Sequence, residues 1–396
     1  ADYGVSTGEV TVDLTKVRER KRAIVDRFSG AARRGLEEEE NVELIFGEAS
    51  FTAPHELRVE TRNDGELCLK APVVFINTGT RSRIPQIEGL SNVPFLTNVT
   101  VMELAETPEH LVVLGGGYIG LEFAQMFRRF GARVTVVQNK AQVLPREDED
   151  VASEMTRILR EDGVDILLSA EPTSAALDGQ GATRLQVATP EGKAELSATA
   201  LLVATGRVPN TDRLHLESAG VESDREGYIL VNDRLETNVK GVYALGDVKG
   251  GPAFTHVSYD DYRVVEANLL HGGGASIENR IVPYCVFTDP ELGRVGLTER
   301  EARERGLRFE VARLPMKRVA RALESDETRG FMKAIIDPDT MQILGAAILG
   351  VGGGEVMSVI EVAMMGKLPC TVLRDGIFAH PTLAESLNNL FSDLGD

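Results

Sequence analysis

The sequence predicts an α/β protein of several domains, and three observations predict it. The run LVVLGGGYIGLEFA, residues 111–124, has the pattern of a strand, a glycine turn and a helix. Two apolar runs, VVFINTG and LLVATG, end in Thr-Gly and resemble buried parallel strands. A chain of 396 residues is also long enough for two or three domains with separate cores.

Composition narrows the class of protein. Hydrophobic residues make up 42% and charged residues 26%, which is typical of a globular chain. The net charge of −18 disfavours nucleic acid as a partner, because a negative surface repels phosphates. We find no apolar run of membrane-spanning length and no secretory signal, and therefore expect a cytoplasmic protein.

The elements before residue 105 are predicted in chain order. Apolar spacing at Leu14, Val17 and Ile24 predicts a helix over residues 12–40. Short strands are expected at 42–46, 57–60 and 73–76, and the segment RIPQIEGL has the composition of a loop.

A second unit begins near residue 109. Strands are predicted at LVVL and RVTVVQ, with a helix at IGLEFAQMFRRF between them, and further strands follow as far as LLVATGRVPN. GVYALGD is the next strand, and a helix passes through Tyr262 and Leu270. The glycine cluster HGGGA predicts a linker, and a third unit starts at about Asn279.

The glycine turn carries the strongest local signal. Gly115, Gly117 and Gly120 form GxGxxG between a strand and a helix. The first glycine permits the tight turn, the second lets the backbone approach a pyrophosphate, and the third lets helix and strand pack closely. We interpret the motif as a dinucleotide site, with a structural glycine turn as the alternative.

The end of the following strand bears on the choice of cofactor. An acidic residue there would favour NAD, but this chain has Gln138, followed by Asn139 and Lys140. Glutamine does not repel a 2′-phosphate and Lys140 could pair with one, so the pattern favours NADP over NAD. The alternative is that Lys140 is simply solvated.

TNVKGVYALGDV is a second specific signal. It places Gly246 and Asp247 at the end of a buried strand, where ligands of open α/β sheets bind. An aspartate in a turn is often a cap, but the preceding TGR motif with Gly206 and Arg207 favours a ligand site.

The stretch FAHPTLAES places His380 five residues before Glu385. A carboxylate that holds one ring nitrogen leaves the other free as a base, so the pair is a candidate for proton transfer. A cap on the last helix is the alternative. Three cysteines are too few and too scattered for a disulfide framework or a metal site; Cys285 and Cys370 are expected to be buried or capping residues, and Cys68 lies in a strand pattern.

Together and in this order, these motifs resemble the flavoprotein disulfide reductases, the family of dihydrolipoamide dehydrogenase, glutathione reductase and mercuric reductase. The resemblance covers the whole chain and is strongest to the mercuric-reductase-like branch that includes the reactive-chlorine-resistance copper(II) reductase. The stretches that carry it are LPREDEDVA, SYDDYRVV, VPYCVFTDPELGRVGLTE, DETRGFMKAIID and LRDGIFAHPTLAESLNNLF.

The resemblance implies two Rossmann-like nucleotide-binding domains and a C-terminal α+β interface domain that forms a homodimer. The FAD domain would comprise residues 1–105 and 226–275, and would be incomplete. The NAD(P) domain would comprise 106–225 and the interface domain 276–396. The resemblance also implies these roles: Tyr118 over the nicotinamide pocket, Glu122 near the flavin, and Asp247 with Thr78, Gly79 and the backbone around Ala49 at FAD.

In such a reductase, His380 and Glu385 would act across the dimer on a redox-active cysteine pair. The family's first GxGxxG unit and its CxxxxC pair are not found in this sequence, and we expect a longer reductase represented in part. The implied activity is NAD(P)H-dependent reduction of a disulfide or a thiophilic metal ion such as copper(II) or mercury(II). Mercury is doubtful, since the C-terminal vicinal cysteines are missing from FSDLGD. The alternatives are a non-catalytic nucleotide-binding dimer and a cysteine-independent flavin diaphorase.

Overall fold

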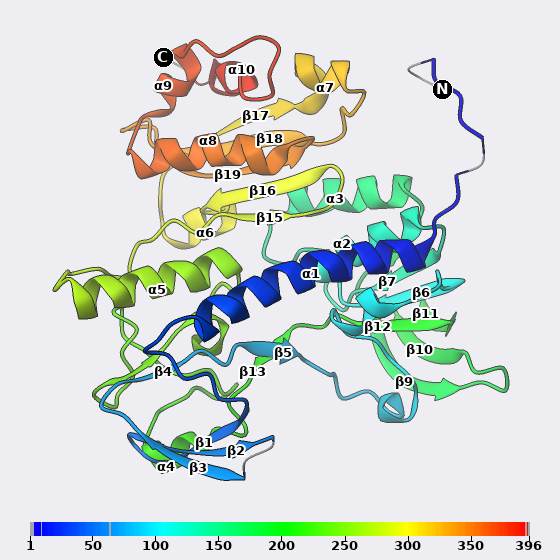
Figure 1. Cartoon of the computed structure of the whole chain (residues 1–396). Helices are drawn as coiled ribbons and strands as arrows, with labels where there is room; N and C mark the ends of the chain where they lie inside the picture. The colour runs from blue at the N-terminus through cyan, green and yellow to red at the C-terminus, as the bar shows by residue number, and fades with distance from the viewer. Residues whose placement is uncertain (1–3, 9, 63–64, 393, 395–396) are drawn as a thin grey trace. The chain divides into compact units, whose positions relative to one another are not determined.

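The computed structural model describes residues 4–8, 10–62, 65–392 and 394 (Figure 1). They form two compact units. The larger unit comprises residues 1–15, 84–205 and 281–396, and the smaller unit comprises 16–83 and 206–280. Each unit is described by itself below.

The larger unit contains a four-stranded parallel sheet in the order β12-β6-β7-β8. Parallel neighbours need crossover connections, and α2 and α3 provide two of them. The bounds are β6 (His110–Leu114), α2 (Tyr118–Arg129), β7 (Arg133–Val137), α3 (Glu149–Glu161), β8 (Val164–Leu167) and β12 (Ala200–Val203), with short 3₁₀ turns η1 (Leu90–Asn92) and η2 (Thr100–Glu103) before them.

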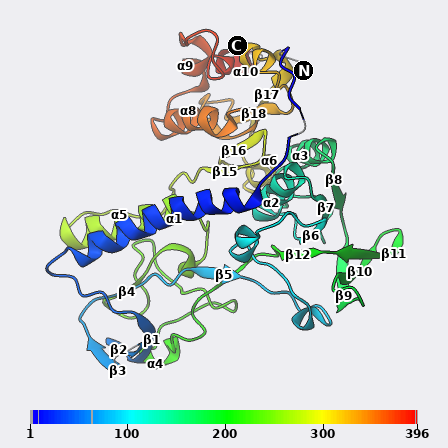
Figure 2. The ribbon, with the colours of Figure 1, turned by 45° about the vertical axis from the view of Figure 1, so that its right-hand side comes forward.

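Strand β6 is buried on both faces, which explains its continuous apolar sequence. Leu111 and Val113 pack in a core with Phe127 of α2. Val112 and Leu114 belong to a second core, which also contains residues of an antiparallel sheet. That sheet comprises β9 (Glu171–Leu177), β10 (Thr183–Thr189) and β11 (Gly192–Ala198) (Figure 2).

The C-terminal part of this unit is a five-stranded antiparallel sheet in the order β15-β16-β19-β18-β17. Helices α8 and α10 pack on it around a core that includes Ile348, Ile360 and Phe391. The bounds are β15 (Tyr284–Val286), β16 (Glu291–Gly296), α6 (Glu299–Glu304), β17 (Glu310–Pro315), η4 (Met316–Arg318), α7 (Ala320–Glu324), β18 (Phe331–Ile336), β19 (Ile343–Gly350), α8 (Gly353–Met365), α9 (Cys370–Asp375) and α10 (Ser386–Ser392).

The described residues of the smaller unit form three small sheets together with helices α1, α4 and α5. One is antiparallel, in the order β1-β2-β3; β14 pairs with β4 in parallel, and β13 pairs with β5 antiparallel. The bounds are α1 (Leu14–Glu37, of which all but the first two residues belong here), β1 (Gly47–Ala53), β2 (Glu56–Thr61), β3 (Glu66–Lys70), β4 (Val74–Ile76), β5 (Thr80–Ser82), β13 (Arg207–Pro209), α4 (Leu216–Ala219), β14 (Val242–Ala244), η3 (Gly246–Lys249) and α5 (Thr255–Leu270).

One predicted strand is wrong. Residues 42–46 form no strand, and the first strand starts at Gly47. Val42, Leu44 and Phe46 alternate as a strand would, but all three are exposed and no neighbouring strand pairs with them. Strand β4 is parallel, as expected, although Phe75 at its centre is 47% exposed. No helix among the described residues is long and apolar enough to span a membrane.

Candidate functional site

The glycine motif forms the turn between β6 and α2, and the surroundings of its three glycines differ. A Cβ on Gly115, whose φ is +109°, would lie 2.4 Å from the carbonyl oxygen of Ala204. A Cβ on Gly120 would lie 2.0 Å from the carbonyl oxygen of Gly115. Gly117 has nothing within 4 Å of such an atom. The turn therefore has two glycines that the fold requires and one that leaves open space in front of the backbone.

Helix α2 starts directly after Gly117, which is its N-terminal flanking residue. Its first N–H groups and the positive end of its dipole favour a phosphate at this place. A backbone cradle with open space at Gly117, next to a helix N-terminus, fits the pyrophosphate of NAD(P)H.

Gln138, directly after β7, is buried, and its side-chain amide forms hydrogen bonds within the protein. The Gly116 N–H donates to Oε1 over 3.4 Å, and Nε2 donates to the carbonyl of Gln142 at 3.0 Å. Gln138 thus ties the glycine turn to the segment after β7. The side chain of Lys140, two residues later, is exposed.

Tyr118 and Glu122 lie one helical turn apart on α2, and thus on the same face. The Phe287 N–H donates to Oε1 of Glu122 at 2.9 Å. Burial raises the pKa of Glu122, and the bond from Phe287 offsets this only in part. A carboxyl group with a perturbed pKa next to a dinucleotide turn is a candidate functional group.

In the smaller unit, Asp247 follows β14 and is held by contacts from two other strands. The Thr80 hydroxyl donates to its Oδ2 at 2.8 Å. Arg207 donates to Thr80 Oγ1 at 2.6 Å, and its Nε lies 3.9 Å from Asp247 Oδ2. Oδ1 of Asp247 has no hydrogen bond within the described part of the chain.

Several predicted flavin residues are brought together here. Pairing of β5 with β13 and of β4 with β14 gathers Thr78, Gly79, Gly206, Arg207, Gly246 and Asp247. Gly79 and Gly206 have positive φ and open space at the Cβ position. Exposed backbone beside a carboxylate with a spare oxygen fits the hydroxyl groups and phosphates of FAD. Ala49 is not among them: it lies in β1, paired with Val59.

His380 and Glu385 meet as the sequence suggests. Nδ1 of His380 lies 2.9 Å from both carboxylate oxygens of Glu385. The histidine side chain is 72% exposed, whereas that of Glu385 is 19% exposed. Glu385 therefore fixes the ring, and Nε2 remains available for a proton on a reacting group.

The cysteines differ in accessibility. Burial, reinforced by the charge of Glu291, raises the pKa of Cys285 to about 12. Cys370 is 1% exposed and burial raises its pKa as well. Cys68 is exposed on β3. Cys285 and Cys370 are thus protonated thiols at neutral pH and poor nucleophiles.

Two clusters of charged side chains were not predicted from the sequence. Asp148, Asp150 and Glu299 could hold a metal by their spacing, but the ammonium of Lys333 lies 3.0, 2.8 and 2.5 Å from them. The other cluster is Asp261 with Lys249 and Arg280. SYDDYRVV and DETRGFMKAIID contain Asp261 and Lys333, but burial of a single charge has no local sequence signal.

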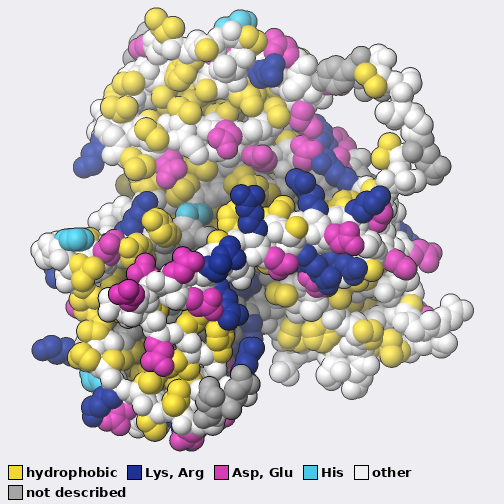
Figure 3. Space-filling model, viewed as in Figure 1, with side chains coloured by type: hydrophobic (Ala, Val, Ile, Leu, Met, Phe, Trp, Pro, Cys, Tyr) yellow, Lys and Arg dark blue, Asp and Glu magenta, His cyan; other side chains and the backbone are white. Residues whose placement is uncertain are grey.

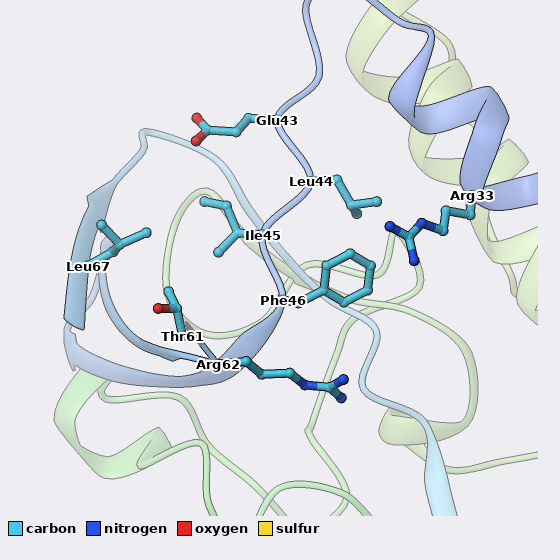
Figure 4. Close-up of a pocket in the computed structure, with 8 residues that line it drawn as sticks. All are labelled: Arg33, Glu43, Leu44, Ile45, Phe46, Thr61, Arg62 and Leu67. Atoms are coloured by element: carbon cyan, nitrogen blue, oxygen red, sulfur yellow. The ribbon is translucent and has the colours of Figure 1, made fainter. Parts of the chain in front are cut away.

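A cavity of about 390 Å³ in the smaller unit contains none of the predicted site residues. Its lining combines Arg33 of α1, the segment before β1 and residues of β2 and β3. The guanidinium of Arg33 lies over the ring of Phe46 at 5.0 Å (Figure 4). The lining residues are Arg33, Glu43, Leu44, Ile45, Phe46, Thr61, Arg62 and Leu67.

Comparison with known proteins adds independent evidence. The model of the pyridine nucleotide-disulphide oxidoreductases matches residues 8–261, and the model of their dimerisation domain matches 282–391. The probable pyridine nucleotide-disulfide oxidoreductase RclA of Escherichia coli K12 is 41% identical over 382 residues, covering 96% of this chain and 85% of that protein. A mercuric reductase of Lysinibacillus sphaericus is 33% identical over 385 residues, covering 97% and 69%.

Solved structures agree with these matches. The HOCl-induced flavoprotein disulfide reductase RclA from Escherichia coli superposes with a TM-score of 0.90 at 40% identity, covering 97% of this chain and 87% of that chain. Its complex with Cu(II) gives the same values.

Proposed function

Because the chain belongs to the pyridine nucleotide-disulphide oxidoreductase family, we propose that it passes electrons from NAD(P)H through FAD to a disulfide or a thiophilic metal ion. At the family level it is an NAD(P)H-dependent flavoprotein oxidoreductase, and its dimerisation domain implies a homodimer. The acceptor we propose first is copper(II), since a relative at 40% identity has been solved as a Cu(II) complex.

The proposal assigns the two nucleotide sites to the residues described above. Gly115, Gly117 and Gly120 would hold the pyrophosphate of NAD(P)H, with Tyr118 and Glu122 on the adjacent helix face. Asp247 with Thr78, Gly79, Gly206 and Arg207 would hold FAD. Bound FAD would take the two electrons of a hydride from NAD(P)H and deliver them as a pair to a disulfide, or one at a time to two copper(II) ions.

The observation that carries the proposal is the His380–Glu385 pair. An exposed imidazole oriented by a carboxylate is suited to give or take a proton at a thiol or another acceptor. Hydride transfer from NAD(P)H to flavin needs no such group. The pair therefore belongs to the half-reaction with the acceptor.

Half-reactions of His380→Ala test this assignment. Loss of a positioned acid–base group should slow disulfide reduction by about 100-fold or more, because the thiolates formed in that step take up protons. Reduction of the flavin by NADPH should stay within about twofold of wild type, since His380 takes no part in it. Stopped-flow reduction by NADPH measures one half-reaction. Reoxidation of the pre-reduced enzyme by copper(II), mercury(II), a disulfide and a quinone measures the other.

The control is His271→Ala, which removes an exposed histidine at the end of α5. It should leave both half-reactions unchanged. If His380→Ala slowed both half-reactions equally, the histidine would not belong to the acceptor step and the assignment would fail.

A cysteine-independent diaphorase is the second candidate. The observation that favours it is the burial of two thiols, which raises the pKa of Cys285 and Cys370 and makes both poor nucleophiles. Alkylation with iodoacetamide after reduction of the enzyme by NADPH separates the two, because only a reduced thiol reacts. A diaphorase keeps its quinone turnover after alkylation, whereas a thiol-dependent reductase loses disulfide and metal-ion turnover.

A further inference from the structure

Asp261 on α5 is a fully buried carboxylate, with 0% of its surface exposed. Aspartate is almost never found at such a place unless its charge is paired. Oδ1 accepts a hydrogen bond from Arg280 Nη1 at 2.7 Å. Oδ2 accepts one from the backbone N–H of Gly246 at 2.8 Å and lies 3.2 Å from Lys249 Nζ.

The two cations depend on Asp261 in turn. The side chain of Lys249 is 4% exposed and that of Arg280 is 16% exposed. Removing the carboxylate would leave both positive charges without their buried partner, which is costly in a protein interior. The adjacent Asp260 also contacts Arg280, at 3.3 Å, but its side chain is 41% exposed and it does not bond to the turn.

The N–H that donates to Asp261 belongs to Gly246, in a turn whose backbone conformation is tightly restricted. Gly246 has φ +66°, and a Cβ there would lie 2.7 Å from both Asn77 Oδ1 and Ser258 Oγ. Its neighbour is Asp247, whose Oδ2 is already bonded to Thr80. The orientation of the Gly246 peptide thus decides where the spare oxygen of Asp247 lies.

We propose that Asp261 is a positioning residue for the flavin-binding turn. Through the Gly246 N–H, and held in place by Lys249 and Arg280, it keeps the turn in the conformation that presents Asp247 to FAD. The inference rests on the proposed function in one respect, that the Asp247 turn binds FAD. Asp261 itself makes no contact with the cofactor in this account.

Three variants of the full-length chain test the inference. Asp261→Ala removes the acceptor and should raise the Kd for FAD at least about tenfold, because a buried N–H and two cations lose their partner. Asp261→Asn keeps an oxygen for the Gly246 N–H and should give an intermediate Kd. Asp260→Asn, the matched control, should bind FAD within about twofold of wild type, because an exposed ion pair contributes little.

Two further measurements separate positioning from general loss of structure. Binding of NADPH depends on the other unit and should be unchanged in all three variants. Hydrogen exchange of the peptide over residues 242–250 reports on the Gly246 N–H without any flavin. Exchange there should be faster in Asp261→Ala than in Asp260→Asn.

The outcomes are distinct. Equal FAD affinity and equal exchange in Asp261→Ala and Asp260→Asn would overturn the inference, as would a loss of NADPH binding equal to the loss of FAD binding. Should Asp261→Ala fail to fold, Asp261→Asn decides the question by the same measurements. A wild-type chain that binds NADPH but no FAD would contradict the proposed function, while hydrogen exchange would still decide whether Asp261 fixes the turn.

Discussion

Gly117 precedes α2 and Gly120 lies in its first turn, yet an added Cβ would have different effects at the two positions. At Gly117 the new atom would project into open space, so the fold should tolerate it. At Gly120 it would collide with a backbone carbonyl that cannot move aside. Substitutions at the two positions therefore distinguish an effect on ligand binding from an effect on folding.

Gly117→Ala should keep the melting temperature of the wild type and weaken NADPH binding, because the methyl group occupies the approach to the backbone. Gly120→Ala should lower the free energy of unfolding by about 1–3 kcal/mol and weaken NADPH binding as well. Thermal melts and NADPH titrations measure both. A loss of stability in Gly117→Ala as large as that in Gly120→Ala would contradict the distinction.

For single residues, the sequence predicts the backbone conformation better than it predicts which groups a side chain contacts. The turn at Gly115, Gly117 and Gly120 could be predicted because three glycines between a strand and a helix have few other uses. The internal bonds of Gln138 could not, because a strand end does not reveal which way its side chain turns. Cys370 was expected to be a buried or capping residue and is buried, but only the folded chain shows the charge of Glu291 next to Cys285.

At the scale of elements, the strand expected at 42–46 shows the limit of alternation as a signal. Val42, Leu44 and Phe46 have the right period, but a strand also needs a neighbour to accept its hydrogen bonds. The cluster around Lys333 shows another limit. Its carboxylates come from the start of α3 and from α6, which are far from β18 in the sequence. No local sequence pattern therefore predicts the cluster.

Lys333 should contribute strongly to stability over a defined pH range. Burial acts to lower its pKa, but the carboxylates of Asp150, Glu299 and Asp148 raise it overall. For Asp148, burial acts to raise the pKa, but the Glu299 N–H and Lys333 hold it below its usual value. The lysine's contribution is therefore lost as pH rises through its raised pKa. That of Asp148 is lost as pH falls through its lowered pKa.

Lys333→Met should thus lower the free energy of unfolding by about 3 kcal/mol at pH 7, because three carboxylates lose their cation. The difference from wild type should shrink below about pH 4, where carboxylates take up protons. Denaturant unfolding at several pH values measures it. Lys317→Met, at an exposed lysine, is the control. A difference independent of pH would show that the lysine acts through packing and not charge.

For the whole molecule, the dimerisation domain implies a second copy, and the α8 side of the larger unit offers a face for it. Figure 3 shows hydrophobic side chains gathered over this side. Val362 and Met365 of α8 are each 65% exposed and Ile377 is fully exposed. Apolar side chains gathered on one exposed face are typical of a protein–protein contact. We infer that this face is the dimer interface.

Met365→Glu should weaken the dimer by about tenfold or more, because the symmetric contact would bury an unpaired carboxylate of each subunit against apolar surface. Light scattering behind a sizing column measures the shift towards monomer. Leu323→Glu on α7, where the leucine is 57% exposed, should leave the dimer intact. A dimer unaffected by Met365→Glu would place the interface elsewhere.

An anaerobic titration followed by visible absorption tests whether this chain is a flavoprotein that NAD(P)H reduces. The purified protein should show the spectrum of oxidised flavin, and NADPH should bleach it. A long-wavelength thiolate–flavin band during the titration would identify the thiol-dependent reductase, and bleaching without that band would identify the diaphorase. A colourless protein that binds NADPH but takes up no FAD would contradict the claim and leave a nucleotide-binding dimer.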